Sequence, residues 1–112
     1  MRGIKEIKEV NRKEMYMDAN QIRFLILQRK EEIKEKFKAE VIGIFGSYAR
    51  GEEKEESDID VLVRFSQGAT LFDLVALGDY LEGLFGIPVD IVSERAIHPI
   101  IKDDVLKDLV LV

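Results

Sequence analysis

The chain has 112 residues, 46% of them hydrophobic, which is enough for the core of one domain and excludes global disorder. Its 17 basic and 22 acidic residues give a net charge of −5, so we do not expect direct nucleic-acid binding, which needs a dense basic surface. The absence of cysteine and the presence of a single histidine exclude disulfides, zinc–thiolate sites, thiol catalysis and multi-histidine metal sites.

The sequence divides into a polar N-terminal segment and one domain. Residues 1–19 are largely charged and predict either a short helix or a loose arm, and residues 20–112 form the domain. The segment lacks the apolar stretch of a secretory signal, and no apolar run reaches the roughly 20 residues of a spanning helix. We therefore expect a cytoplasmic protein with no membrane contact.

Hydrophobic periodicity predicts helices and strands that follow one another through the domain. In chain order these are a helix over about 20–38 capped by Asn20, a strand at 41–45, a loop or short helix start at 46–56, a strand at 59–65, a helix at 71–85, a strand at 89–92, a helical segment at 98–106 and a last short strand at 109–112. Helices and strands mixed around one small sheet indicate an α/β or α+β domain.

The glycine-containing stretch Gly46–Gly51 follows the first strand directly and is suited to hold a phosphate. Glycine lets the backbone approach closely, and free N–H groups at a helix start favour anions. Ser47 adds a hydroxyl donor and Arg50 a guanidinium fork. The spacing G-x-x-x-x-G continues as Glu-Glu rather than Lys-Ser/Thr, which excludes a P-loop NTPase. An ordinary capped turn has the same pattern, so the loop alone does not decide the function.

Three aspartates in two predicted strands are candidate metal ligands. Residues i and i+2 of a strand share a face, which places Asp58 and Asp60 on one side, about 6–7 Å apart, where they can share a hard cation. A surface strand with a wet acidic face is the alternative. Asp90 stands alone in an apolar strand and joins the other two if the strands are neighbours; otherwise it is an aspartate at the sheet rim. Together with the phosphate loop, three carboxylates form a two-metal phosphoryl-transfer site.

The combination resembles a known family. Gly46-Ser47, ten intervening residues and Asp58-x-Asp60 match the signature of the nucleotidyltransferases similar to DNA polymerase beta. The string GSYARGEEKEESDIDVLV resembles the minimal nucleotidyltransferase (MNT) domains in particular, and Asp90 matches the third carboxylate of that family. The resemblance covers roughly residues 20–112 and implies a small mixed β-sheet flanked by helices.

What this resemblance implies about function is specific. MNT proteins of the MntA type are often the antitoxin half of a pair with a HEPN-domain ribonuclease toxin, and transfer AMP from ATP to a toxin tyrosine. By resemblance, Asp58, Asp60 and Asp90 are the catalytic residues and hold two Mg²⁺ ions, and Gly46 and Ser47 bind the phosphates. Arg50 either joins them there or braces the loop against acidic neighbours. A HEPN protein is the expected partner, and a homodimer or a hetero-oligomer is compatible with the sequence.

Two other functions compete with this one. A non-catalytic nucleotide-binding module could neutralise a partner by steric occlusion, and a nucleotidyltransferase for small molecules or nucleic acid could need a partner subunit. We expect His98 to be a structural or surface residue rather than a general base, and Tyr48 to pack the loop. The acidic residues after the loop predict a solvated face, with a docking patch as the alternative.

Overall fold

The computed structural model describes residues 17–112, so the prediction for the N-terminal segment lies almost wholly outside the described residues. The elements are α3 (Ala19–Gln28), α4 (Lys30–Phe37), β1 (Ala39–Phe45), α5 (Gly46–Arg50), β2 (Ile59–Phe65), α6 (Leu71–Phe85), β3 (Val89–Ser93), the 3₁₀ turn η1 (Glu94–Ala96), α7 (Pro99–Asp108) and β4 (Val110–Leu111). All the strands and helices expected within these residues are present.

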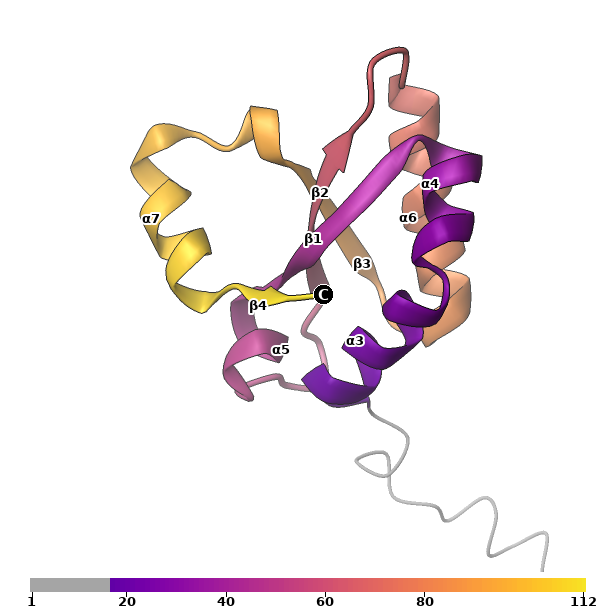
Figure 1. Ribbon diagram of the computed structural model, residues 1–112. Coiled ribbons are helices and arrows are strands. Elements are labelled where there is room, and N and C mark those ends of the chain that lie inside the picture. Colours follow the sequence, from indigo (N-terminus) through magenta and orange to yellow (C-terminus); the bar gives the residue numbers. More distant parts are fainter. Residues whose placement is uncertain (1–16) are drawn as a thin grey trace, which may run out of the picture.

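The strands form one mixed sheet in the order β3-β2-β1-β4 (Figure 1). Strand β1 pairs antiparallel with β2 and with β4, whereas β2 and β3 are parallel and joined through α6. A parallel pair needs a crossover connection, and the 15-residue helix α6 supplies it. This small mixed sheet flanked by helices confirms the expected fold class.

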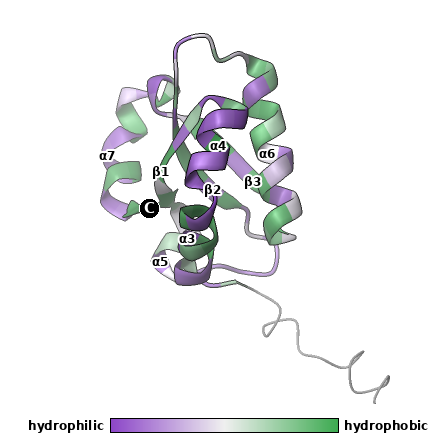
Figure 2. Ribbon diagram, turned by 45° about the vertical axis from the view of Figure 1, so that its right-hand side comes forward, coloured by the Kyte–Doolittle hydropathy of each residue, from purple (hydrophilic) through white to green (hydrophobic). Residues whose placement is uncertain are grey.

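One face of the sheet is covered by α3, α4 and α6, and the core lies between them (Figure 1). Ile59, Val61 and Val63 of β2 point into it and are fully buried, as the alternation in the sequence predicted. Helices α3 and α4 bury Ile22, Ile26 and Ile33, and α6 buries Leu77, Leu81 and Phe85. Figure 2 shows apolar and polar residues alternating along α6, as in a helix with one apolar side.

The predicted helix over 20–38 is wrong in two details. The chain leaves the helix at Arg29, so two helices replace one. The N-cap is Asp18 rather than Asn20, because Asp18 and Gln21 form a reciprocal capping box, with both hydrogen bonds at 2.9 Å. The earlier start adds one more residue at the helix entry, and Met17 packs against the core there.

A bulge in β1 changes which of its side chains face the core. The pairing with β2 slips between Val41 and Gly43, so Val41 and Ile44, three residues apart, are both buried on the helical side. Ile42 is left on the opposite face. Gly43 meets β4 so closely that a Cβ would overlap the carbonyl oxygen of Val110, which explains a glycine in a buried strand.

The opposite face of the sheet carries α7 and η1 at one side and the polar ends of the strands (Figure 1). Asp60, Leu62 and Arg64 of β2 lie on this face. No helix within residues 17–112 is long and apolar enough to cross a membrane.

Candidate active site

The glycine-serine turn and the second aspartate of the motif are in direct contact. Phe45, the last residue of β1, pairs with Asp60 in β2, so the turn after β1 begins beside this carboxylate. Gly46 has φ +75°, in the left-handed region, and a Cβ on it would overlap Oδ2 of Asp60. Two constraints, backbone conformation and close approach, therefore require glycine at this position.

The short helix α5 begins at Gly46 in this turn and carries Ser47 as its second residue. Tyr48 anchors the helix, because its side chain is only 2% exposed and belongs to the core cluster, which confirms its predicted packing role. The helix ends at Gly51 in the left-handed conformation, and the carbonyl of Ser47 accepts a hydrogen bond from the amide of Glu52 at 2.9 Å. The Ser47 hydroxyl makes no hydrogen bond with any residue of 17–112 and is available to a ligand.

The three predicted carboxylates gather at the same end of the sheet. Asp60 and Asp90 are register partners across the parallel pair β2–β3, and Asp58 lies two residues before Asp60. Asp60 is half-buried, whereas Asp58 and Asp90 are exposed. Asp90 thus lies on the edge strand β3, as the rim alternative expected, and it also has Asp60 as its neighbour across the strands.

The electrostatics of Asp60 are unusual for an aspartate. Burial, followed by the negative charges of Asp90 and Asp58, raises the pKa of Asp60 to about 6, and the guanidinium of Arg50 opposes the shift. The carboxylates thus repel one another across the two strands. An acidic cluster with this excess of negative charge favours a cation.

Magnesium suits the donor set, because it prefers carboxylate, phosphate and water oxygens. Within residues 17–112, no three carboxylate, histidine or cysteine side chains are placed to hold an ion by themselves. Mg²⁺ does not require such a cage, since it is usually held by one or two carboxylates together with waters and substrate phosphates. The pair Asp58 and Asp60, with Asp90 opposite, fits that mode.

Arg50 is braced by two acidic side chains. Its Nη1 donates to Oδ2 of Asp108 at 2.7 Å and its Nε donates to Oε2 of Glu52 at 3.1 Å, and both hydrogen bonds raise the pKa of Arg50. The bracing alternative is thus the arrangement observed, and a phosphate contact by Arg50 stays a prediction. Asp108 was missed by sequence analysis, because nothing in the local sequence ties it to a residue 58 positions away.

His98 has the structural role expected. Its Nδ1 accepts a hydrogen bond from the amide of Ile100 at 3.1 Å and so caps α7, with Pro99 at the first helical position. The acidic stretch after the loop is largely exposed, at Glu52, Glu55 and Glu56, as a solvated face requires.

Comparison with known proteins agrees with this site. The family described as "Nucleotidyltransferase domain" matches residues 26–112. Protein adenylyltransferase MntA of Thermococcus cleftensis is 40% identical over 92 residues, which are 82% of this chain and 93% of that protein. A solved structure described as a "putative minimal nucleotidyltransferase" superposes with a TM-score of 0.67 at 39% identity, covering 86% of this chain and 97% of the other.

More distant in sequence is an MNT antitoxin of Shewanella oneidensis, solved in complex with its tri-AMPylated HEPN toxin. It shares the fold, with a TM-score of 0.61 at 19% identity, and the match covers 83% of this chain and 70% of the other.

A mixed sheet that places a glycine-serine turn against paired aspartates defines a nucleotidyltransferase fold. The chain belongs to the nucleotidyltransferase domain family, since the match covers most of its length. Its similarity to MntA and to a minimal nucleotidyltransferase of nearly the same extent places it among the minimal, polymerase-beta-like members. The family and enzyme class expected from the sequence are confirmed.

Proposed function

We propose that this chain is an antitoxin that transfers AMP from ATP to a tyrosine hydroxyl of a HEPN-domain ribonuclease toxin, with Mg²⁺ as cofactor. The relative from Thermococcus cleftensis is a protein adenylyltransferase at 40% identity. A protein of the same fold is an MNT antitoxin found with a tri-AMPylated HEPN toxin. Both observations support an acceptor that is a second protein.

One observation of this structure carries the proposal. Asp60 contacts the Gly46 turn on one side and faces Asp90 on the other. The residues suited to a triphosphate and those suited to a cation therefore share one edge of the sheet. If the aspartates of β2 had only a structural role, nothing would require Asp60 to pack against the backbone of a glycine turn that is suited to bind phosphate.

Each residue has a distinct role in the proposed reaction. The backbone at Gly46 and the hydroxyl of Ser47 bind the triphosphate and orient its α-phosphorus. Asp58 and Asp60 would hold Mg²⁺ and Asp90 would contribute to a second ion; when bound, the metal would supply positive charge against the phosphates. Asp90, which is exposed on β3 opposite Asp60, accepts the proton of the incoming tyrosine hydroxyl.

The proposed transfer forms one bond to the α-phosphorus of ATP and breaks another. The tyrosine oxygen forms a new bond to the α-phosphorus while the bond from that phosphorus to the bridging oxygen of the β-phosphate breaks. Pyrophosphate leaves with that oxygen, and the proton of the hydroxyl passes to Asp90. The product is a phosphodiester between AMP and the toxin tyrosine.

The experiment is a transfer assay with α-labelled ATP, Mg²⁺ and a candidate HEPN-domain toxin. We expect label on the HEPN protein and a mass increase of one or more AMP units. Asp58→Ala and Asp60→Ala should each abolish transfer, whereas Asp79→Ala, an exposed carboxylate of α6, should leave it unchanged. Transfer that survives both site substitutions would refute the metal assignment.

The same variants separate catalysis from steric occlusion. An occluding protein still neutralises the ribonuclease when Asp58 and Asp60 are both replaced. An adenylyltransferase loses neutralisation and AMP transfer together. Measuring ribonuclease activity beside label transfer in the double variant therefore decides between the two functions.

A further inference from the structure

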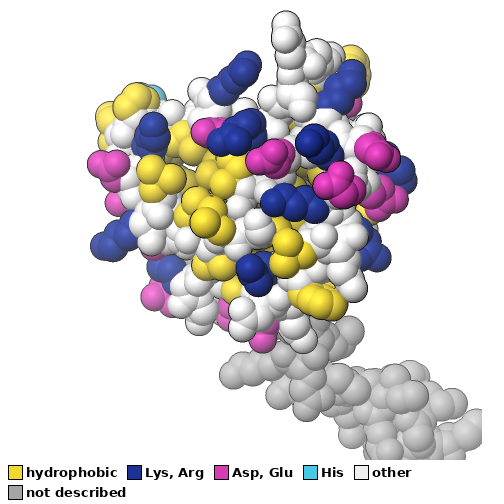
Figure 3. Space-filling model, in the orientation of Figure 1, with side chains coloured by type: hydrophobic (Ala, Val, Ile, Leu, Met, Phe, Trp, Pro, Cys, Tyr) yellow, Lys and Arg dark blue, Asp and Glu magenta, His cyan; other side chains and the backbone are white. Residues whose placement is uncertain are grey.

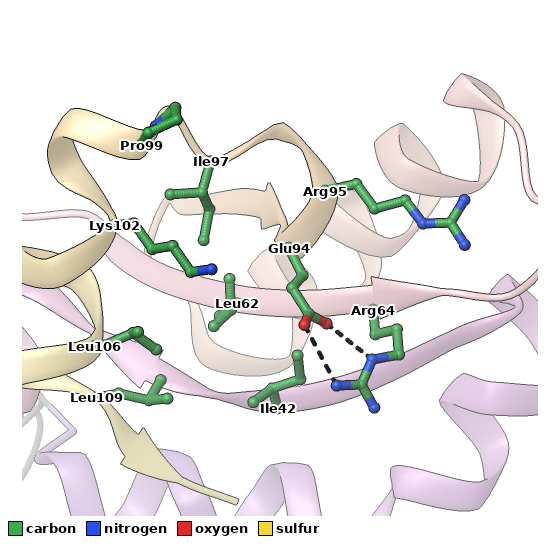
Figure 4. Close-up of a pocket in the computed structure, with 10 residues that line it drawn as sticks. All are labelled: Ile42, Leu62, Arg64, Glu94, Arg95, Ile97, Pro99, Lys102, Leu106 and Leu109. Atoms are coloured by element: carbon green, nitrogen blue, oxygen red, sulfur yellow. Dashed lines mark hydrogen bonds and ion pairs between the residues drawn. The ribbon is translucent and has the colours of Figure 1, made fainter.

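A second feature of the catalytic face is a cleft between the sheet and α7, which we call the α7 cleft. It has a volume of about 700 Å³, is floored by Ile42 and Leu62 and is walled by Leu106 and Leu109 (Figure 4). Figure 3 shows hydrophobic side chains gathered on this side of the molecule, next to Lys and Arg side chains. Clefts of a few hundred Å³ with apolar floors and few polar groups are typical binding sites.

We propose that the α7 cleft binds the acceptor segment of the partner protein, namely a stretch that combines a tyrosine with a neighbouring carboxylate. The inference rests on the function proposed above. It adds the place where the acceptor docks and the chemistry that selects it.

The α7 cleft begins next to the catalytic carboxylates. Leu62 lies two residues beyond Asp60 on the same face of β2, so the floor begins about 6–7 Å from that carboxylate. A tyrosine side chain spans a similar length from its backbone to its hydroxyl. An acceptor whose backbone passes over Leu62 can therefore place its ring on the apolar floor and its hydroxyl beside Asp60 and Asp90.

The charge of the cleft suits an acidic segment. Lys102 points into the cleft toward Leu62 and makes no ion pair with any residue of the described part of the chain (Figure 4). Arg64 is paired, because its Nε donates to Glu94 at 2.8 Å and its Nη1 lies 3.5 Å from Glu40. Besides the hydrogen bond from Arg64, the charges of Lys102 and Arg95 also lower the pKa of Glu94, so the lining holds three cations, Arg64, Arg95 and Lys102, against the single carboxylate of Glu94. An ammonium above an apolar floor is complementary to a carboxylate next to an apolar side chain.

The competing occupant of the cleft is the adenine base of ATP. A base is neutral, so the net positive charge of the lining contributes little to its binding. Leu106, which lines the cleft, is 49% exposed, so the apolar wall reaches the outer surface of α7. A site that extends onto the outer surface fits a protein segment better than an enclosed nucleoside.

The test compares a charge reversal in the cleft with a matched reversal outside it. Lys102→Glu changes the cleft, whereas Lys107→Glu makes the same change on an exposed residue of the same helix that does not line the cleft. Binding of the candidate HEPN toxin is measured by calorimetry without ATP or Mg²⁺, and ATP affinity is measured separately with Mg²⁺ present. We expect Lys102→Glu to weaken HEPN binding at least tenfold and ATP binding less than twofold, and Lys107→Glu to change neither.

Two results would overturn the inference. Unchanged HEPN binding by Lys102→Glu would exclude the cleft as the docking site. A loss of ATP affinity with HEPN binding intact would assign the cleft to the nucleotide instead. Binding and AMP transfer are measured separately. A chain that binds the HEPN protein through the cleft but transfers no AMP would refute the proposed function and leave the docking role of the cleft supported.

A second pair of variants tests the apolar wall of the α7 cleft and leaves Lys102 unchanged. Leu106→Asp places a carboxylate in the wall, and Ile100→Asp does so on the same helix at a side chain that is 80% exposed and outside the cleft. Only Leu106→Asp should weaken HEPN binding. Thermal unfolding of both variants checks that α7 is intact, and equal binding by the two would contradict the inference.

Discussion

Replacing Asp60 with Asn should stabilise the metal-free protein while abolishing its activity. Burial and the charges of Asp90 and Asp58 raise the pKa of Asp60 from 3.8 to about 6. A shift of about 2 pKa units corresponds to about 3 kcal/mol of destabilisation by the ionised form. Asp60 is partly exposed, and solvent screening reduces this to about 1–2 kcal/mol.

The pH dependence gives the sign. A carboxyl group whose pKa is raised in the folded state binds its proton more tightly there, so its contribution to stability is present below the unfolded pKa of about 4. That contribution is lost as the pH rises through about 6. Asp60→Asn should therefore raise the free energy of unfolding at pH 8 and have little effect near pH 4.

The assay is urea unfolding in EDTA at both pH values, followed by the same measurement with Mg²⁺ at pH 8. Mg²⁺ should stabilise the wild type and not Asp60→Asn, because the variant has lost the charge that attracts the cation. Asp79→Asn, on the exposed side of α6, is the control and should show no such pattern. A variant that is less stable than the wild type at pH 8, or equally shifted at both pH values, would refute the reasoning.

Three further predictions follow from contacts described above. Gly46→Ala should destabilise the fold by about 1–3 kcal/mol and abolish AMP transfer, since its methyl group displaces Asp60; unchanged transfer in the label assay would contradict the close approach. Gly43→Ala should push β4 away from β1 and speed hydrogen exchange of the Val112 amide, which bonds the carbonyl of Ile42 at 3.0 Å; protection equal to wild type would show that the strands can adjust. Tyr80→Phe should raise the pKa of Glu32 towards its ordinary value, because the hydrogen bond from the Tyr80 hydroxyl is the largest cause of the lowered pKa of Glu32. An NMR titration of Glu32 that finds no change would assign the shift to Lys36 instead.

The motif and the strands around it were predictable because their signals are local. Alternation in β2 identifies Ile59 and Val61 as core residues and Asp60 as facing away, and the structure agrees. The break at Arg29 could not be predicted, because the buried residues on either side of it, Ile26 and Ile33, keep the spacing of one continuous helix. The bulge in β1 has one trace in the sequence, Gly43 inside the apolar run, but a glycine there does not say which side chains change face.

The parts of the site that sequence analysis missed depend on contacts between distant residues. Arg50 is held by Asp108, and the α7 cleft joins Leu62 to Lys102 across some forty positions. Neither set has a spacing that any local rule recognises. These contacts exist only once β4 has paired with β1 and brought α7 back over the sheet.

The in-register pairing of β2 and β3 links the alignment of the acidic residues to the hydrophobic effect. Val89 and Ile91 flank Asp90 and pack against the core, so sliding β3 by one residue would expose both and turn the aspartate toward the helices. Val89 and Ile91 therefore keep Asp90 in register with Asp60, although neither side chain contacts a substrate. Mutations that loosen the inner side of β3 should appear in a functional screen as catalytic defects, although they lie a full sheet thickness away from the reacting atoms.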